Sequence, residues 1–200
     1  QVLGEGPVVI ARRTDGSPAV AFSVSVAAGS ALDPPGSPGV AHFLSRVIDR
    51  GTARHAADEI ADLLDTAGVT LATAVTRHQF TIACTCLAED FPRLLALTAE
   101  IVRRPTLPPD QVETRRAEIV TGLRQDADNP AVVAVEQLVE RLYRGGHPYG
   151  RRSKGTPESI ERITRADLAG FHAAAFGPRG ACLVAVGDVD ERQVVDEAAR

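Results

Sequence analysis

The chain has 200 residues, of which 44% are hydrophobic and 24% are charged, which is typical of a globular domain that buries an apolar core. The formal net charge of -4 argues against attraction to nucleic-acid phosphates or anionic lipid, and no apolar run approaches the length of a membrane-spanning helix. We therefore expect no nucleic-acid partner and no membrane partner, and one domain over residues 1–200.

Three cysteines, Cys84, Cys86 and Cys182, are an odd number in a chain long enough to fold without disulfides, which favours a reducing compartment. Lys154 is the only lysine beside many arginines and alanines, as in proteins of high-GC genomes. We expect a bacterial, cytoplasmic protein. Export stays open, because the chain begins at Gln1 and lacks methionine, so its start is expected to be processed or trimmed.

The first half of the chain alternates strand and helix patterns. Residues 8–13 and 19–27 read as two strands, and the turn residues 14–18 between them predict a hairpin. Apolar residues at helical spacing predict helices over 40–49 and 56–67. Two alternating segments, VTLATAVT and QFTIACTCL, then predict an antiparallel strand pair.

The second half is mostly helical. We expect helices over 91–103, 109–127 and 131–143, then an exposed loop rich in glycine and proline. A helix capped by Thr164, a strand within ACLVAVGDV and the start of a further helix at Glu191 complete the chain. Hairpins and runs of helices, without regular β-α-β alternation, predict an α+β fold with a mainly antiparallel sheet and helices packed on one face.

One short segment carries the chemistry: residues 39–46, GVAHFLSR, followed by Arg50-Gly51-Thr52. It resembles the insulinase, pitrilysin and mitochondrial processing peptidase family, whose pattern is Gly-x-Ala-His-Phe-x-Glu-His and then Lys-Gly-Thr. In that family the two histidines bind zinc from one helix face and the glutamate is the general base. Here only His42 remains. Ser45 stands at the base position and Arg46, which has no free lone pair, at the second ligand position.

The family's third ligand is a glutamate on a later helix, and the segment RRAEIVTGLRQDADNP places Gly122 at that position. The resemblance therefore implies a site that has lost two ligands and its base together. We expect no catalytic residue, no metal ligand and no cofactor, and treat His42, Ser45, Arg46 and Gly122 as vestigial. Glu118, one turn before Gly122, is placed to reach toward His42, but a His–Glu pair alone is a weak zinc site.

The resemblance extends from about Val8 to Arg200 and includes the segments HPYG at 147–150 and GDV at 187–189. It implies a half-domain with a six-stranded sheet, normally followed by a second copy of the same fold. That carboxyl-terminal half is absent from this sequence. The loop around 145–150 is expected to be either a contact surface or a structural turn.

The resemblance also implies a place for peptide. In the family a substrate adds as a strand beside the hairpin that follows the zinc helix, which corresponds here to Leu71, Ala72, Thr73 and Ala74. Backbone pairing needs no particular side chain, so strand addition can survive the loss of catalysis. An ordinary interior strand would have the same sequence.

Three functions fit these observations. The first is a non-catalytic partner subunit that helps an intact homologue, bearing His-x-x-Glu-His, to bind or process peptides. The second is a structural scaffold domain in a larger complex, and the third is a zinc-dependent endopeptidase with an unconventional site. Metal analysis separates the third from the others, and a neighbouring gene for an intact homologue would favour the first.

Overall fold

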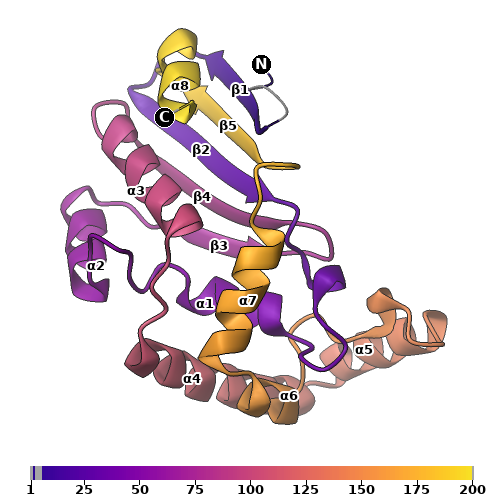
Figure 1. Cartoon of the computed structure of the whole chain (residues 1–200). Coiled ribbons are helices and arrows are strands. Elements are labelled where there is room, and N and C mark those ends of the chain that lie inside the picture. Colours follow the sequence, from indigo (N-terminus) through magenta and orange to yellow (C-terminus); the bar gives the residue numbers. More distant parts are fainter. Residues whose placement is uncertain (1, 3–5, 200) are drawn as a thin grey trace.

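A twisted sheet of five strands, in the order β1-β5-β2-β4-β3, forms the centre of the computed structural model, which describes residue 2 and residues 6–199 (Figure 1). Strand β5 is parallel to β1, and the other neighbours are antiparallel. The strands are β1 (Val8–Arg13), β2 (Ala19–Val26), β3 (Ala72–Val75), β4 (Phe80–Leu87) and β5 (Cys182–Gly187).

One face of the sheet carries the core. Along β4, Phe80, Ile82, Cys84 and Cys86 are buried while the residues between them are more exposed, because successive side chains of a strand point to opposite faces. Figure 1 shows α3 and α8 against one face of the sheet, α7 across α1 at the lower end of the sheet, and α4 to α6 beyond that end. The expected α+β fold, with a mainly antiparallel sheet and helices on one face, is confirmed.

The predicted helices form close to their expected bounds. The sequence did not predict α6, although Thr156 caps it and Pro157 opens it, a recognisable start signal. Two short 3-10 turns, η1 (Ser30–Leu32) and η2 (Pro148–Gly150), lie in the segments that connect the other elements. The helices are α1 (Val40–Val47), α2 (Ala57–Thr66), α3 (Phe91–Arg103), α4 (Pro109–Ala127), α5 (Pro130–Leu142), α6 (Pro157–Arg162), α7 (Arg165–Ala175) and α8 (Glu191–Ala198).

The expected amino-terminal hairpin is wrong. Strands β1 and β2 both form, but β5 lies between them and pairs with each. Leu183 and Ala185 of β5 are buried, and a central position in the sheet covers them with a neighbouring strand on each side. Within the described residues the sheet also has five strands and not the six that the family resemblance implied. No described helix is long and apolar enough to cross a bilayer.

Candidate functional site

Helix α1 is fixed at its amino-terminal end by a buried acid. The Asp33 carboxylate accepts hydrogen bonds from the backbone N–H groups of Gly39, at 2.7 Å, and Ala41, at 3.1 Å. These are unpaired donors of the first turn, so Asp33 caps the helix from a distance in sequence. Burial raises the pKa of Asp33 to about 6, although both backbone hydrogen bonds and Arg151 oppose that rise.

Two further segments are locked onto this end of α1. Arg151 Nη1 donates to the Asp33 carbonyl at 2.6 Å, and Arg77, in the β3–β4 turn, donates to the Arg151 carbonyl at 2.7 Å. Gly39 itself has a φ of 93°, and a Cβ there would lie 2.7 Å from the carbonyl oxygen of Lys154. A side chain at position 39 would therefore push the 151–155 loop off the helix.

His42, the retained histidine of the motif, is half-buried on α1. Burial lowers its pKa to about 4, with further lowering by the cations of Lys154 and Arg46, while Asp126 acts in the opposite direction. Lys154 Nζ donates to the Asp126 carboxylate at 2.7 Å. At neutral pH His42 is therefore an uncharged imidazole, next to a lysine–aspartate ion pair that links the 151–155 loop to α4.

The other positions that the family resemblance assigns to the site are two on α1, Ser45 and Arg46, and one on α4, Gly122. Ser45 is buried, and its Oγ donates to the His42 carbonyl at 2.7 Å, a bond within the helix. A hydroxyl held in this way cannot act as a general base toward a water molecule. Arg46 is exposed in the last turn of α1. Gly122, on α4, has open space where a side chain would begin, since no atom lies within 4 Å of an ideal Cβ.

Zinc does not fit the residues present. A catalytic zinc takes three protein ligands, and here His42 would be the only one of the motif, with no side chain at Gly122 and two cations, Arg46 and Lys154, close by. No cluster of three or more His, Cys, Asp or Glu side chains that could hold a metal occurs in the described part of the chain. The geometry can position α1 and its neighbours, but it provides neither a base nor a Lewis acid from the motif.

Glu118, which the sequence suggested as an acid within reach of His42, does not act on it. Glu118 pairs with Arg115 on the surface of α4, at 2.5 Å, and is not among the charges that act on His42. Asp126 is the acid that acts on His42, and the signal for it was its place one turn after Gly122, on the same helix face. The ion pair with Lys154 could not be found this way, because it depends on the path of a loop.

The predicted peptide-binding residues lie at a sheet edge. Strand β3 pairs only with β4 in the described sheet, and Ala72 and Ala74 are exposed while Leu71, just before the strand, is buried. Thr76 N–H donates to the Gln79 carbonyl, so by alternation along the pair the backbone groups of Thr73 face away from β4. Thr73 Oγ1 also donates to the Ser45 carbonyl at 2.9 Å, which ties this edge to α1.

The remaining histidines contact other residues of the fold, and His147 Nδ1 accepts a hydrogen bond from the Tyr149 backbone N–H at 3.1 Å. His55 lies 3.5 Å from Glu100, His172 Nε2 contacts the Val102 carbonyl, and His78 contacts the Tyr149 hydroxyl. None of these is among the groups acting on His42. The three cysteines are unpaired, and burial raises the pKa of Cys86 to about 11, which removes it as a nucleophile.

Comparison with known proteins gives a consistent pattern. The family model described as insulinase (peptidase family M16) matches residues 8–154. A crystal structure of a peptidase M16 inactive domain from Pseudomonas fluorescens has a TM-score of 0.92 and 28% sequence identity, and the match covers 100% of this chain and 48% of that chain.

Two relatives are described differently, one as a zinc protease and the other as a subunit of the cytochrome b-c1 complex. An uncharacterized zinc protease of Mycobacterium bovis is 28% identical over 157 residues, which are 78% of this chain and 36% of the relative. The mitochondrial cytochrome b-c1 complex subunit 1 of Bos taurus is 23% identical over 191 residues, which are 96% of this chain and 40% of the relative. The chain thus spans less than half the length of these relatives.

Proposed function

Because the chain belongs to the insulinase family of peptidases, family M16, we propose that it is a catalytically inactive homologue that acts as a partner subunit. In this role it helps an intact homologue, one with a complete His-x-x-Glu-His motif, to bind or process peptides. The observation that carries the proposal is that Ser45, Arg46 and Gly122 stand where the family resemblance expects the base and two ligands, while α1 itself is capped by Asp33. The similarity to an inactive domain of the same family supports it.

The test is assembly with such a homologue. Expression of this chain with an intact family member from the same genome should give a complex of fixed stoichiometry in size-exclusion chromatography with light scattering. Recovery of the lone chain or only of homodimers, with the homologue eluting separately, would contradict the proposal.

Peptide binding is proposed at the β3 edge, over residues 71–74. Its support is the exposed edge and the outward backbone of Thr73, which suit strand addition. Thr73→Pro removes the outward N–H as well as the hydroxyl, whereas Thr73→Ala removes only the hydroxyl bond to Ser45. In the complex we expect Thr73→Pro to weaken peptide binding and Thr73→Ala to leave it nearly unchanged; equal effects would place the peptide elsewhere.

A scaffold role in a larger complex is the second candidate, favoured by the similarity to a cytochrome b-c1 complex subunit. A scaffold would assemble with partners without changing their handling of peptide. Peptide affinity of the homologue, measured with and without this chain, separates the two roles. An unchanged affinity in a stable complex would favour the scaffold.

The third candidate, a zinc-dependent endopeptidase with an unconventional site, rests on the names of relatives such as the Mycobacterium bovis protein. Peptide hydrolysis that depends on added zinc and disappears with chelator would establish it. For the cell compartment we propose the cytoplasm, supported by the three free thiols, and fractionation of the native host tests this.

A further inference from the structure

Helix α5 differs from every other described α-helix because none of its residues is buried. It projects away from the sheet beyond the end of α4 (Figure 1). Val135, Leu138 and Leu142 are exposed to 60%, 57% and 66%. Their spacing puts them on one side of the helix, so together they form an apolar stripe without a partner in this chain.

A different side of α5 is the one fastened to the body. Val133 lines a small cavity together with Leu123 of α4 and Pro157 of α6. Glu136 pairs with Arg152 at 3.2 Å across the same cavity. Since the helix is already anchored here, the stripe is not needed to attach α5 to its own domain.

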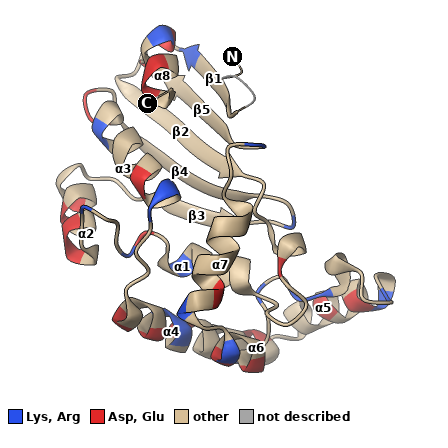
Figure 2. Cartoon of the chain, viewed as in Figure 1, with Lys and Arg blue, Asp and Glu red and all other residues tan. Residues whose placement is uncertain are grey.

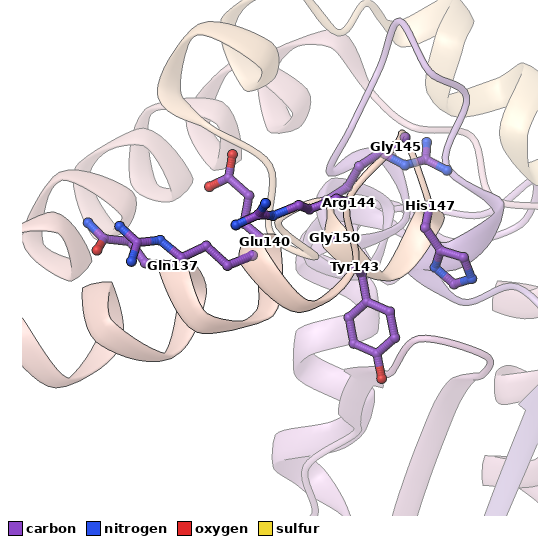
Figure 3. Close-up of a pocket in the computed structure, with 10 residues that line it drawn as sticks. Gln137, Glu140, Tyr143, Arg144, Gly145, His147 and Gly150 are labelled. Atoms are coloured by element: carbon purple, nitrogen blue, oxygen red, sulfur yellow. The ribbon is translucent and has the colours of Figure 1, made fainter.

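Positive charge gathers beside the stripe. The end of α5 and the loop after it line an open cavity of about 650 Å³ (Figure 3). Three arginines, Arg141, Arg144 and Arg151, contribute to its wall against a single acid, Glu140. No ion pair neutralises Arg141 or Arg144 within the described residues. This surface is therefore basic, although the chain as a whole has a net charge of -4.

We infer that this α5 surface docks an acidic, amphipathic segment of a partner protein. Aliphatic side chains of that segment cover Val135, Leu138 and Leu142, and its carboxylates face Arg141 and Arg144. Arginine suits this role because its planar group binds carboxylates through two parallel hydrogen bonds. The inference rests on the partner role proposed above and names where, and through which chemistry, the partner binds.

The charges of the helix itself favour protein over membrane. Figure 2 shows acidic and basic residues interspersed along α5 and its following turn. Between Pro130 and Arg144 the only basic residues are Arg141 and Arg144, at the end of the helix, and the acids are Glu140 and Glu136, the latter paired with Arg152 on the anchored side. A helix that lies on anionic lipid has a polar face rich in lysine and arginine, which this one lacks.

A pair of designed peptides tests the inference. One is a labelled helical peptide with leucines spaced i, i+3 and i+7 and glutamates beside them, and its twin has lysine at every glutamate. By fluorescence anisotropy at low salt we expect the acidic peptide to bind about tenfold more tightly than its twin, a difference that shrinks with added salt.

Three variants locate the site. Arg141→Gln with Arg144→Gln should abolish the preference for the acidic peptide, and Val135→Gln with Leu138→Gln should weaken both peptides about tenfold. The matched control is Arg103→Gln with Arg104→Gln, two exposed arginines at the end of α3, which should change nothing. Circular dichroism checks that each variant is folded, and we expect all of them to be, because the altered side chains are exposed.

Several results would overturn the inference: no binding of either peptide, equal binding of both, or a preference that survives the Arg141 and Arg144 changes. Binding only to phosphatidylglycerol vesicles would replace it by a membrane role. Because no homologue is present in this experiment, its failure beside a stable complex with the homologue would reject the surface and leave the partner role standing.

Discussion

Helices α1 and α5 are two extremes of burial: α1 is packed inside the fold and α5 lies exposed on its surface. Helix α1 buries six of its residues, among them Phe43 and Leu44 with no exposed surface, and α5 buries none. Both are short and amphipathic, so the difference lies in what covers their apolar faces. Helix α1 is covered by its own chain, whereas the stripe of α5 is available to another.

Helix α1 keeps the contacts that hold it in the fold, although the residues expected for metal binding and catalysis are replaced. Around α1 the acid that caps the helix, the loop that abuts Gly39 and the contact to β3 are present, while Ser45, Arg46 and Gly122 stand where the family resemblance expects the base and two metal ligands. These contacts hold α1 within the fold. The described residues thus combine a closely packed α1 with an exposed α5.

The largest effect is expected in the core of α1. Leu44→Ala removes a fully buried side chain and leaves a cavity, which should lower the free energy of unfolding by about 2–5 kcal/mol. Chemical denaturation measures the change. A loss below about 1 kcal/mol would mean that α1 is not the closely packed helix described here.

The buried cap of α1 should give a pH signature. The pKa of Asp33 is raised from 3.8 to about 6, so its protonated form is favoured in the folded state, and this stabilisation is complete below about pH 3.8 and is lost as the pH rises through 6. The shift corresponds to about 3 kcal/mol. Relative to Asp33→Asn, the wild type should therefore become more stable by that order when the pH falls from 7 to 4.

Comparing the two proteins at each pH is necessary because His42 acts in the opposite direction. Its pKa is lowered to about 4, so the stability it contributes is lost as the pH falls from about 6.5 toward 4. The difference between wild type and Asp33→Asn cancels this contribution. A difference that stays constant with pH would contradict the assignment of Asp33 as a buried, titrating cap.

The smallest effect is expected on α5. Leu138→Gln replaces an exposed side chain, and in the isolated chain the free energy of unfolding should change by no more than about 0.5 kcal/mol. The same denaturation experiment measures it. A loss comparable to that of Leu44→Ala would show that the stripe is covered within this chain, which would remove the contrast between the helices.

Local signals explain what could be predicted from the sequence. The bounds of α3 and α4 follow from apolar periodicity and from Pro105 and Pro109, which lie within a few residues of those ends. The β3–β4 hairpin follows from alternation across a short turn. The vestigial positions on α1 are assigned from the family resemblance, and helix geometry explains their spacing, because residues three and four apart share a face.

Contacts distant in sequence explain the errors. The insertion of β5 between β1 and β2 joins residues more than 150 positions apart, and no local pattern reports it. Asp33 caps α1 across a proline-rich turn, and Lys154 reaches Asp126 from a loop. These pairings depend on how the elements pack, so the charge environment of His42 became visible only in the folded structure.

The most direct test of the account is the zinc content of the purified protein after incubation with zinc and exhaustive dialysis, measured by plasma mass spectrometry. Its matched control is the triple variant Ser45→Glu, Arg46→His and Gly122→Glu, which adds two ligands to His42 and restores the base, with Arg46→His alone as an intermediate. We expect far less than one equivalent for the wild type, little for Arg46→His, and clear uptake by the triple variant, for which the open space at Gly122 leaves room. About one equivalent of zinc in the wild type would contradict the claim that this chain has lost its metal site.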